Sequence, residues 1–263
     1  IECVEAAVEL EFDAGVKRER EIFKECVKSE ESVAMRHVFF AERAANKIPG
    51  ISKDVKPRTI AKAGVLGAGT MGGGIAMNFV NAGIPVTIIE QSQEALDRGM
   101  GIIAKNYAAT VAKGRMSQEQ MDACLGAITP TTSMDDLADA DMIIEAVFET
   151  MAVKKEVFTK LDAVAKPDAI LTSNTSYLDI NEIAEAIPGR NGHVLGTHFF
   201  SPANVMRLVE VVRTDNVSDE NLVTTMDIGR RMRKLPIVTG VCHGFIGNRM
   251  LEGYFGEASI MVE

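Results

Sequence analysis

The spacing of hydrophobic residues changes character near residue 60. Residues 13–47 carry many charges, and their apolar positions recur at roughly helical spacing, which predicts two amphipathic helices and no strand. The segment IPGISKDVKPRTI (48–60) combines proline, glycine and lysine, a composition typical of a linker. The clearest domain boundary in the sequence is therefore this linker.

Short runs of strand-forming residues follow the linker, and helical stretches separate most of them. The runs are KAGVLGA (62–68), PVTIIE (85–90), DMIIEAV (141–147), AILTSN (169–174), HVLGTHFF (193–200), RLVEVV (207–212) and PIVTG (236–240). This alternation predicts an α/β fold with a mainly parallel sheet covered by helices on both faces.

Two helix boundaries carry capping signals. Ser117 and Gln120 fit a capping box, so we expect two helices between the second and third strand runs. Ser218 precedes two acidic residues and opens a helix that ends in the basic run RRMRK (230–234). Cations suit the negative end of a helix dipole, so this run needs no ligand to explain it.

Composition narrows the classes of function. The 263 residues include 28 Lys and Arg against 37 Asp and Glu, and a net charge of −9 argues against a general nucleic-acid-binding protein. Four cysteines lack paired or metal-binding spacing, so we expect reduced thiols and no metal site. No apolar run is long enough to span a bilayer. The chain begins without Met and ends inside a predicted helix, so we expect a fragment of a longer protein.

A glycine-rich turn, VLGAGTMGGGIA (65–76), lies between the first strand run and a helix. Its G-x-G-x-x-G spacing predicts a tight turn, a close approach of backbone to a pyrophosphate, and close packing of helix on strand. The N-terminus of the following helix offers free N–H groups to phosphates. We predict a Rossmann-type, doubly wound domain whose cofactor-binding residues are Gly67, Gly69, Thr70, Met71 and Gly72.

Glu90 ends the next strand run at the spacing expected of a ribose-binding carboxylate. A carboxylate there accepts hydrogen bonds from the ribose hydroxyls and repels a 2′-phosphate, so we expect NAD rather than NADP. The competing interpretation is a glycine-rich turn beside a solvated glutamate.

The run LVEVV (208–212) places a carboxylate, Glu210, among apolar strand residues, where an ionised group needs a partner. His198 ends the preceding run, and the intervening SPAN segment (201–204) predicts a turn. If the two strands are neighbours, the carboxylate can orient the imidazole as a proton acceptor. His193 is a competing candidate, and a purely structural His–Glu pair is about as probable from spacing alone.

Three further residues follow strand runs at the edge where doubly wound sheets bind ligands. Ser176 in SNTSYLDI (173–180) could contact substrate or could be a helix N-cap, because Asp179 completes a capping box. Glu149 and Lys154 begin the helix after DMIIEAVFE, and a solvated helix face explains both equally well. A base beside a bound NAD suits the oxidation of an alcohol to a ketone.

Four motifs in this order, GVLGAGTMGGGIA, SNTSYLDI, HFFSPANVMRLVEVV and GFIGNRM, closely resemble the L-3-hydroxyacyl-CoA dehydrogenase family over residues 60–263. The resemblance implies NAD-dependent oxidation of (S)-3-hydroxyacyl-CoA to 3-ketoacyl-CoA in fatty-acid β-oxidation. It implies that His198 is the base, Glu210 its partner, and Ser176 and Asn248 substrate contacts. It also implies that Glu90 binds the ribose and that Glu149 and Lys154 line the nicotinamide side.

Two departures from the single-function members, Ser201 and the missing proline before Gly244-Phe245, resemble the branch fused to an enoyl-CoA hydratase/isomerase. We therefore expect three parts: the helical end of an upstream hydratase/isomerase domain with its linker (1–57), the NAD-binding domain (58–243), and the first helix of a C-terminal helical domain (244–263). With most of that last domain absent, we expect the fragment to bind NAD but to turn over poorly.

The resemblance implies a parent protein that is a homodimer or part of a complex with a thiolase. It implies a bacterial cytoplasmic location, or a peroxisomal one if the source is eukaryotic. Two alternatives stay open. One is a dehydrogenase of the 3-hydroxyisobutyrate/6-phosphogluconate type, which relies on a lysine in its second domain. The other is a non-catalytic NAD-binding module whose His–Glu pair is structural.

Overall fold

The computed structural model describes residues 1–262, which form two compact units, Ile1–Lys47 and the chain from Ile48 onward. The first unit contains α1 (Glu2–Glu9), α2 (Phe12–Lys28) and α3 (Glu30–Ala45). Helices α2 and α3 confirm the two amphipathic helices predicted from sequence, whereas α1 was not predicted. The linker (48–60) belongs to the second unit, and it and the two residues that follow it have no regular secondary structure.

The second unit is built on one eight-stranded sheet with the order β3-β2-β1-β4-β5-β6-β7-β8. The strands are β1 (Ala63–Leu66), β2 (Val86–Ile89), β3 (Ile128–Thr131), β4 (Met142–Glu145), β5 (Ile170–Ser173), β6 (Val194–Phe199), β7 (Leu208–Arg213) and β8 (Leu235–Gly240). Strands β1 to β6 are parallel, β7 is antiparallel to β6, and β8 is parallel to β7. The mainly parallel Rossmann-type sheet is therefore confirmed.

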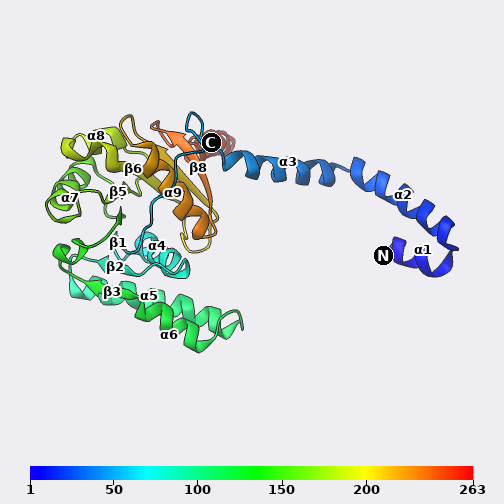
Figure 1. The fold of residues 1–263 in the computed structure, drawn as a ribbon, viewed down its shortest axis with the longest axis horizontal. Coiled ribbons are helices and arrows are strands. Elements are labelled where there is room, and N and C mark those ends of the chain that lie inside the picture. Colours follow the sequence, from blue (N-terminus) through cyan, green and yellow to red (C-terminus); the bar gives the residue numbers. More distant parts are fainter. Residues whose placement is uncertain (263) are drawn as a thin grey trace. The chain divides into compact units, whose positions relative to one another are not determined.

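Helices cover both faces of this sheet (Figure 1). On one face lie α4 (Thr70–Asn81), α5 (Gln93–Ala112) and α9 (Asp219–Arg231), whose apolar residues share one core cluster. On the other face lie α7 (Met151–Val164) and α8 (Ile180–Ala184), which share a second cluster. All four residues of β1, β2, β4 and β5 are buried, as expected of strands covered on both sides.

The remaining elements connect these layers. Helix α6 (Gln118–Gly126) packs on α5 and β3, and the short helices η1 (Met134–Leu137) and η2 (Pro188–His193) precede β4 and β6. Ser117 and Gln120 form the predicted capping box of α6, and Ser218 caps α9. Helix α10 (Gly247–Val262) ends the described chain, and Glu263 of the expected third part lies outside the described residues.

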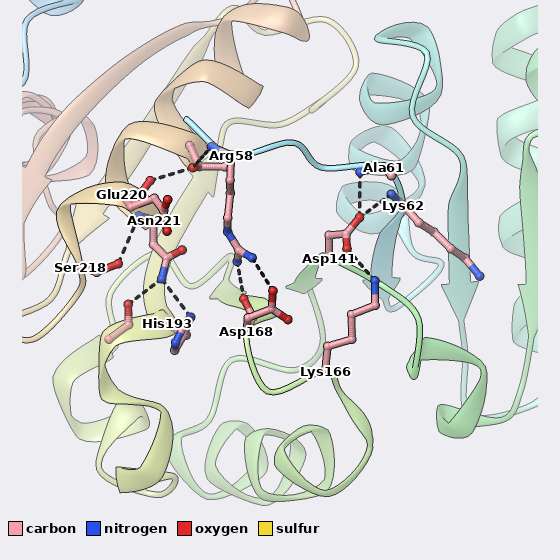
Figure 2. A network of polar contacts seen from close by, with 12 residues as sticks. Arg58, Ala61, Lys62, Asp141, Lys166, Asp168, His193, Ser218, Glu220 and Asn221 are labelled. Atoms are coloured by element: carbon pink, nitrogen blue, oxygen red, sulfur yellow. Dashed lines mark hydrogen bonds and ion pairs between the residues drawn. The ribbon is translucent and has the colours of Figure 1, made fainter. Parts of the chain in front are cut away.

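The linker is held to the amino ends of the strands by two acids, Asp141, which is half-buried, and Asp168, which is exposed (Figure 2). The backbone N–H groups of Ala61 and Lys62 donate to Asp141 Oδ2 at 2.8 and 3.1 Å, just before β4. The Arg58 guanidinium donates to Asp168, just before β5. The linker is thus fixed at the sheet edge opposite the glycine-rich turn, which follows the carboxyl end of β1.

Candidate active site

The glycine-rich turn is built so that two of its positions have no room for a side chain. Gly67 follows β1 with φ +96°, and a Cβ there would lie 2.6 Å from the carbonyl oxygen of Ala146. A Cβ on Gly72 would lie 1.8 Å from the carbonyl oxygen of Gly67. Helix α4 begins directly after Gly69, which has no side chain to cap its first N–H groups. Those N–H groups are left for a ligand phosphate.

A cavity of about 550 Å³ lies over this turn. Glu90 lines it, and Glu90 Oε2 accepts a 2.9 Å hydrogen bond from the N–H of Ala68 while Oε1 accepts one from Gln91 at 2.8 Å. These bonds fix the carboxylate beside the glycines and leave it half-exposed. The other residues lining the cavity include the predicted Gly67, Gly69, Thr70 and Met71. A carboxylate and free helix N–H groups in one cavity fit a ribose joined to a pyrophosphate.

His198 and Glu210 are direct partners across the antiparallel pair β6–β7. His198 Nδ1 lies 2.6 Å from Glu210 Oε2, and their side chains are 5% and 0% exposed. The N–H groups of Ile246 and Gly247 donate to Glu210 Oε1 at 2.9 and 2.8 Å. Burial alone would raise the pKa of Glu210, but the hydrogen bonds from His198, Gly247 and Ile246 together hold it below its ordinary value. Glu210 is therefore a fully hydrogen-bonded, ionised carboxylate.

His193, the competing histidine, lies at the other end of β6. It is the last residue of η2, and its Nδ1 is 3.0 Å from the Asn221 amide nitrogen (Figure 2). Burial and the charges of Arg58 and Arg190 lower the pKa of His193. His193 thus lies at the amino end of β6, a strand's length from the sheet edge that carries the glycine-rich turn. His198 lies near the carboxyl end of β6, at that edge.

Ser176 lies in the loop after β5, half-buried, and its N–H donates to Glu149 Oε1 at 2.7 Å. The capping-box alternative for Ser176 is wrong, because α8 begins at Ile180 and its N-cap is Asp179. Thr175 Oγ1 instead accepts from the N–H groups of Tyr177 and Leu178, which extends the loop before the helix starts.

Lys154 is not on a solvated helix face, so that alternative is wrong for this residue. Its side chain is 1% exposed, and Nζ lies 2.7 Å from Glu145 Oε1 and 3.4 Å from Glu149 Oε2. Glu149 remains partly exposed, at 41% of its side chain. Burial would raise its pKa, but hydrogen bonds from Thr175 and Ser176 and the charge of Lys154 lower it. Lys154 thus holds Glu149 beside the loop that carries Ser176.

Asn248 is the second residue of α10 and is half-buried. It directly follows Gly247, whose N–H is bonded to Glu210. The first turn of α10 is therefore attached to the His198–Glu210 pair.

Two buried polar residues of this region were missed from sequence. Glu145 ends β4 at 0% exposure and accepts from Lys154 Nζ, Val147 N and Ser173 Oγ, each at 2.7 Å. A carboxylate after the apolar run MII is the same signal that identified Glu210. Asn174 Oδ1 accepts from the N–H of Phe199 at 2.9 Å and ties β5 to β6, and no sequence pattern indicated it.

The arrangement collects these groups at one edge of the sheet. The glycine-rich turn, Glu90, Ser176 and His198 all lie at or just after the carboxyl ends of parallel strands, the edge at which doubly wound sheets bind ligands. Among residues 1–262 no cluster of three metal-ligating side chains is present, and no helix there is long and apolar enough to cross a membrane.

Known proteins resemble this chain over most of its length. It is 39% identical to the peroxisomal bifunctional enzyme of Cavia porcellus and 35% identical to the peroxisomal fatty acid beta-oxidation multifunctional protein MFP2 of Arabidopsis thaliana. Each alignment covers 100% of this chain but 36% of the relative, so the chain spans about a third of their length. The crystal structure of (S)-3-hydroxybutyryl-CoA dehydrogenase PaaH1 from Ralstonia eutropha is 32% identical, with a TM-score of 0.74 over 76% of this chain and 70% of that one.

The glycine-rich turn, its cavity and the whole eight-stranded sheet fall within residues 62–242. This stretch matches the family model described as 3-hydroxyacyl-CoA dehydrogenase, NAD binding domain. The match covers more than half of the chain, and the chain therefore belongs to the 3-hydroxyacyl-CoA dehydrogenase family and contains its NAD binding domain.

Proposed function

We propose that this chain is the dehydrogenase part of a multifunctional β-oxidation enzyme and oxidises (S)-3-hydroxyacyl-CoA to 3-ketoacyl-CoA with NAD. One observation carries the proposal: the buried His198–Glu210 pair lies at the same sheet edge as the dinucleotide turn. Support for this substrate class comes from relatives named as β-oxidation multifunctional proteins.

The geometry supports His198 as the residue that accepts the proton. With Nδ1–H donating to the ionised Glu210, Nε2 of the imidazole carries a lone pair and can accept the proton of the substrate's C3 hydroxyl. Glu210 orients the ring and stabilises the positive charge that the ring gains. NAD supplies the hydride acceptor when bound. Ser176 and Asn248 hold the oxygen at C3, and Glu149 and Lys154 lie on the nicotinamide side.

A basic groove supports a CoA-linked substrate. This groove, of about 670 Å³, is lined by Arg115, Arg207, Arg231, Arg233 and Lys234 from three separate segments, and none of its described lining residues is acidic. The dipole of α9 explains only the cations at its own end. Asn204 and Val205, in the loop that follows His198 and Phe200, also line the groove. We place the CoA phosphates in this groove, because a local cluster of cations attracts a highly charged anion. The cluster contrasts with the net charge of −9 that the protein carries as a whole.

Charge reversal tests the groove. In the complete protein, Arg233→Glu and Arg115→Glu should each raise the KM for acetoacetyl-CoA about tenfold, while the KM for acetoacetyl-pantetheine, which lacks the nucleotide phosphates, stays the same. Arg20→Glu makes the same charge change on the exposed surface of α2 and should alter neither KM. Equal effects on both substrates would place the phosphates elsewhere.

The proposed activity is tested by His198→Gln in the complete protein, followed by NADH absorbance with acetoacetyl-CoA. We expect kcat to fall at least about 10³-fold while NADH affinity, measured by fluorescence, is unchanged. Full activity in His198→Gln would favour one of the alternatives, a structural His–Glu pair or a dehydrogenase that uses a lysine in its second domain.

The wider setting is proposed on the same basis. Residues 1–57 are the helical end and linker of an upstream hydratase/isomerase domain, and α10 begins a helical domain. The parent is a homodimer or joins a thiolase complex. The relatives from Cavia porcellus and Arabidopsis thaliana are named as peroxisomal, and we propose a peroxisomal location for a eukaryotic source and a cytoplasmic one for a bacterial source.

A further inference from the structure

Glu210 has two tasks at once, because its two oxygens face different elements. Oε2 accepts from His198, and Oε1 accepts from the N–H groups of Ile246 and Gly247, where α10 begins. The carboxylate therefore also caps a helix N-terminus, using a strand residue far away in sequence. A shift of α10 along its axis would pull on the same carboxylate that orients the imidazole.

The turn that delivers these N–H groups is held in a costly conformation. Gly244 and Phe245 both have positive φ, +67° and +47°. A left-handed conformation is unfavourable at a residue that has a side chain, as Phe245 has. Phe245 is nevertheless 1% exposed, and its ring centroid is 5.7 Å from that of His198. Burial of this ring anchors the turn beside the histidine.

Gly247 leaves no space for a side chain. A Cβ on Gly247 would lie 2.6 Å from Cζ of Phe200 and 3.7 Å from Glu210 Oε1. The Phe200 ring is half-buried, and its centroid is 4.6 Å from that of His198. An alanine at this position must therefore displace the Phe200 ring, which packs beside His198, or lift α10 from Glu210.

We infer that Gly247 is a positioning residue, which lets the first turn of α10 close onto Glu210 and so couples the placement of this helix to the orientation of His198. This inference rests on the proposed function. It predicts that the domain to which α10 belongs sets the efficiency of the base, and not only the shape of the substrate cleft.

The test is a pair of variants in the complete protein, assayed with acetoacetyl-CoA and NADH. Gly247→Ala should lower kcat about 10- to 100-fold, because a shift on the order of 1 Å has such an effect on a reacting geometry. NADH affinity should stay within about twofold, since the glycine-rich turn is untouched. Gly101→Ala, on an exposed position of α5 with open space around it, should leave kcat unchanged.

Removal of the clash supplies the decisive comparison. In a Phe200→Leu background the shorter side chain should accommodate the new methyl group, so adding Gly247→Ala should change kcat less than about threefold relative to Phe200→Leu alone. This comparison also decides the matter if Gly247→Ala alone fails to fold. An equal loss in both backgrounds, or no loss in either, would overturn the positioning role. Activity in His198→Gln would instead overturn the proposed function itself.

Discussion

Lys154 and Glu145 form an ion pair that is almost completely buried, with Nζ 2.7 Å from Oε1 and side chains 1% and 0% exposed. The pair joins the first half of α7 to the end of β4, directly beneath the loop that carries Glu149. Isolated buried charges are costly, so each member depends on the other.

We expect Lys154→Met to lower the free energy of unfolding by about 3–5 kcal/mol, because it leaves the buried carboxyl group of Glu145 without its partner. Urea denaturation measures this loss. Lys155→Met is a matched control, since the neighbouring Lys155 pairs with Glu182 at the same 2.7 Å but with side chains 38% and 48% exposed. That control should cost less than about 1 kcal/mol. If both variants lost a similar free energy of unfolding, burial would not determine how much an ion pair contributes to stability.

Asp141 should make stability depend on pH. Burial would raise its pKa, but hydrogen bonds from Lys166 and from the N–H groups of Ala61 and Lys62 lower it below its ordinary value of 3.8. A carboxyl whose folded-state pKa is depressed contributes stability above its ordinary pKa and loses that contribution as pH falls through the depressed value. Asp141→Asn should therefore lower the free energy of unfolding by about 1–3 kcal/mol at pH 7, and the difference should be smaller at pH 3, because the charge of Asp141 is lost as the pH falls through the depressed pKa.

Asp139→Asn is the control for this pH dependence. Asp139 pairs with Lys62 at 2.7 Å, but its side chain is 65% exposed, so its removal should cost less than about 1 kcal/mol at either pH. If Asp141→Asn destabilised the protein equally at pH 7 and pH 3, the effect would come from packing rather than from the charge.

Glu90 should set the choice of cofactor. Glu90→Ala removes the carboxylate that lines the cavity over the glycine-rich turn, so NADH should bind about tenfold more weakly and the preference over NADPH should narrow. Fluorescence titration with each cofactor measures both effects. Glu94→Ala, whose side chain is 85% exposed on α5, should leave both affinities unchanged. If Glu90→Ala kept the same preference for NADH over NADPH, Glu90 would not be the residue that binds the ribose.

Local patterns predicted most of the sheet because its strands are short, apolar and separated by helical stretches. Strand β3 escaped prediction, since only Ile128 of its ITPT sequence is buried and Pro130 weakens the pattern. The turn predicted at SPAN (201–204) indicated that β7 is a neighbour of β6, but no pattern predicted that the two strands are antiparallel. Because the turn is short, it also predicted that His198 and Glu210 lie close together.

Some contacts between polar groups of separate elements lay beyond prediction. The burial of Lys154 depends on Glu145 at the end of β4 and on Glu149 in the loop after β4, so a residue that fits a solvated helix face is enclosed instead. In the same way, nothing in LVEVV indicates that Glu210 would also accept from the start of α10. The periodicity of hydrophobic residues indicates which face of a helix or strand is buried, but it does not indicate which polar side chains contact one another on that face.

Gly72 gives the sharpest test of the glycine-rich turn. A methyl group there would meet the carbonyl oxygen of Gly67 at 1.8 Å, and because this atom belongs to the backbone, no side-chain adjustment relieves the contact. Gly72→Ala should therefore force α4 away from β1, abolish NADH binding at concentrations that saturate the unmodified protein, and lower Tm.

Gly101→Ala is the control, because Gly101 is an exposed helix position with nothing near its Cβ. This substitution should raise the free energy of unfolding by about 0.5–1 kcal/mol, since alanine loses less backbone entropy on folding. NADH fluorescence and thermal unfolding of both variants, side by side, separate the steric requirement from the general cost of changing a helical glycine. Normal NADH binding in Gly72→Ala would mean that helix and strand can separate without loss of the phosphate site.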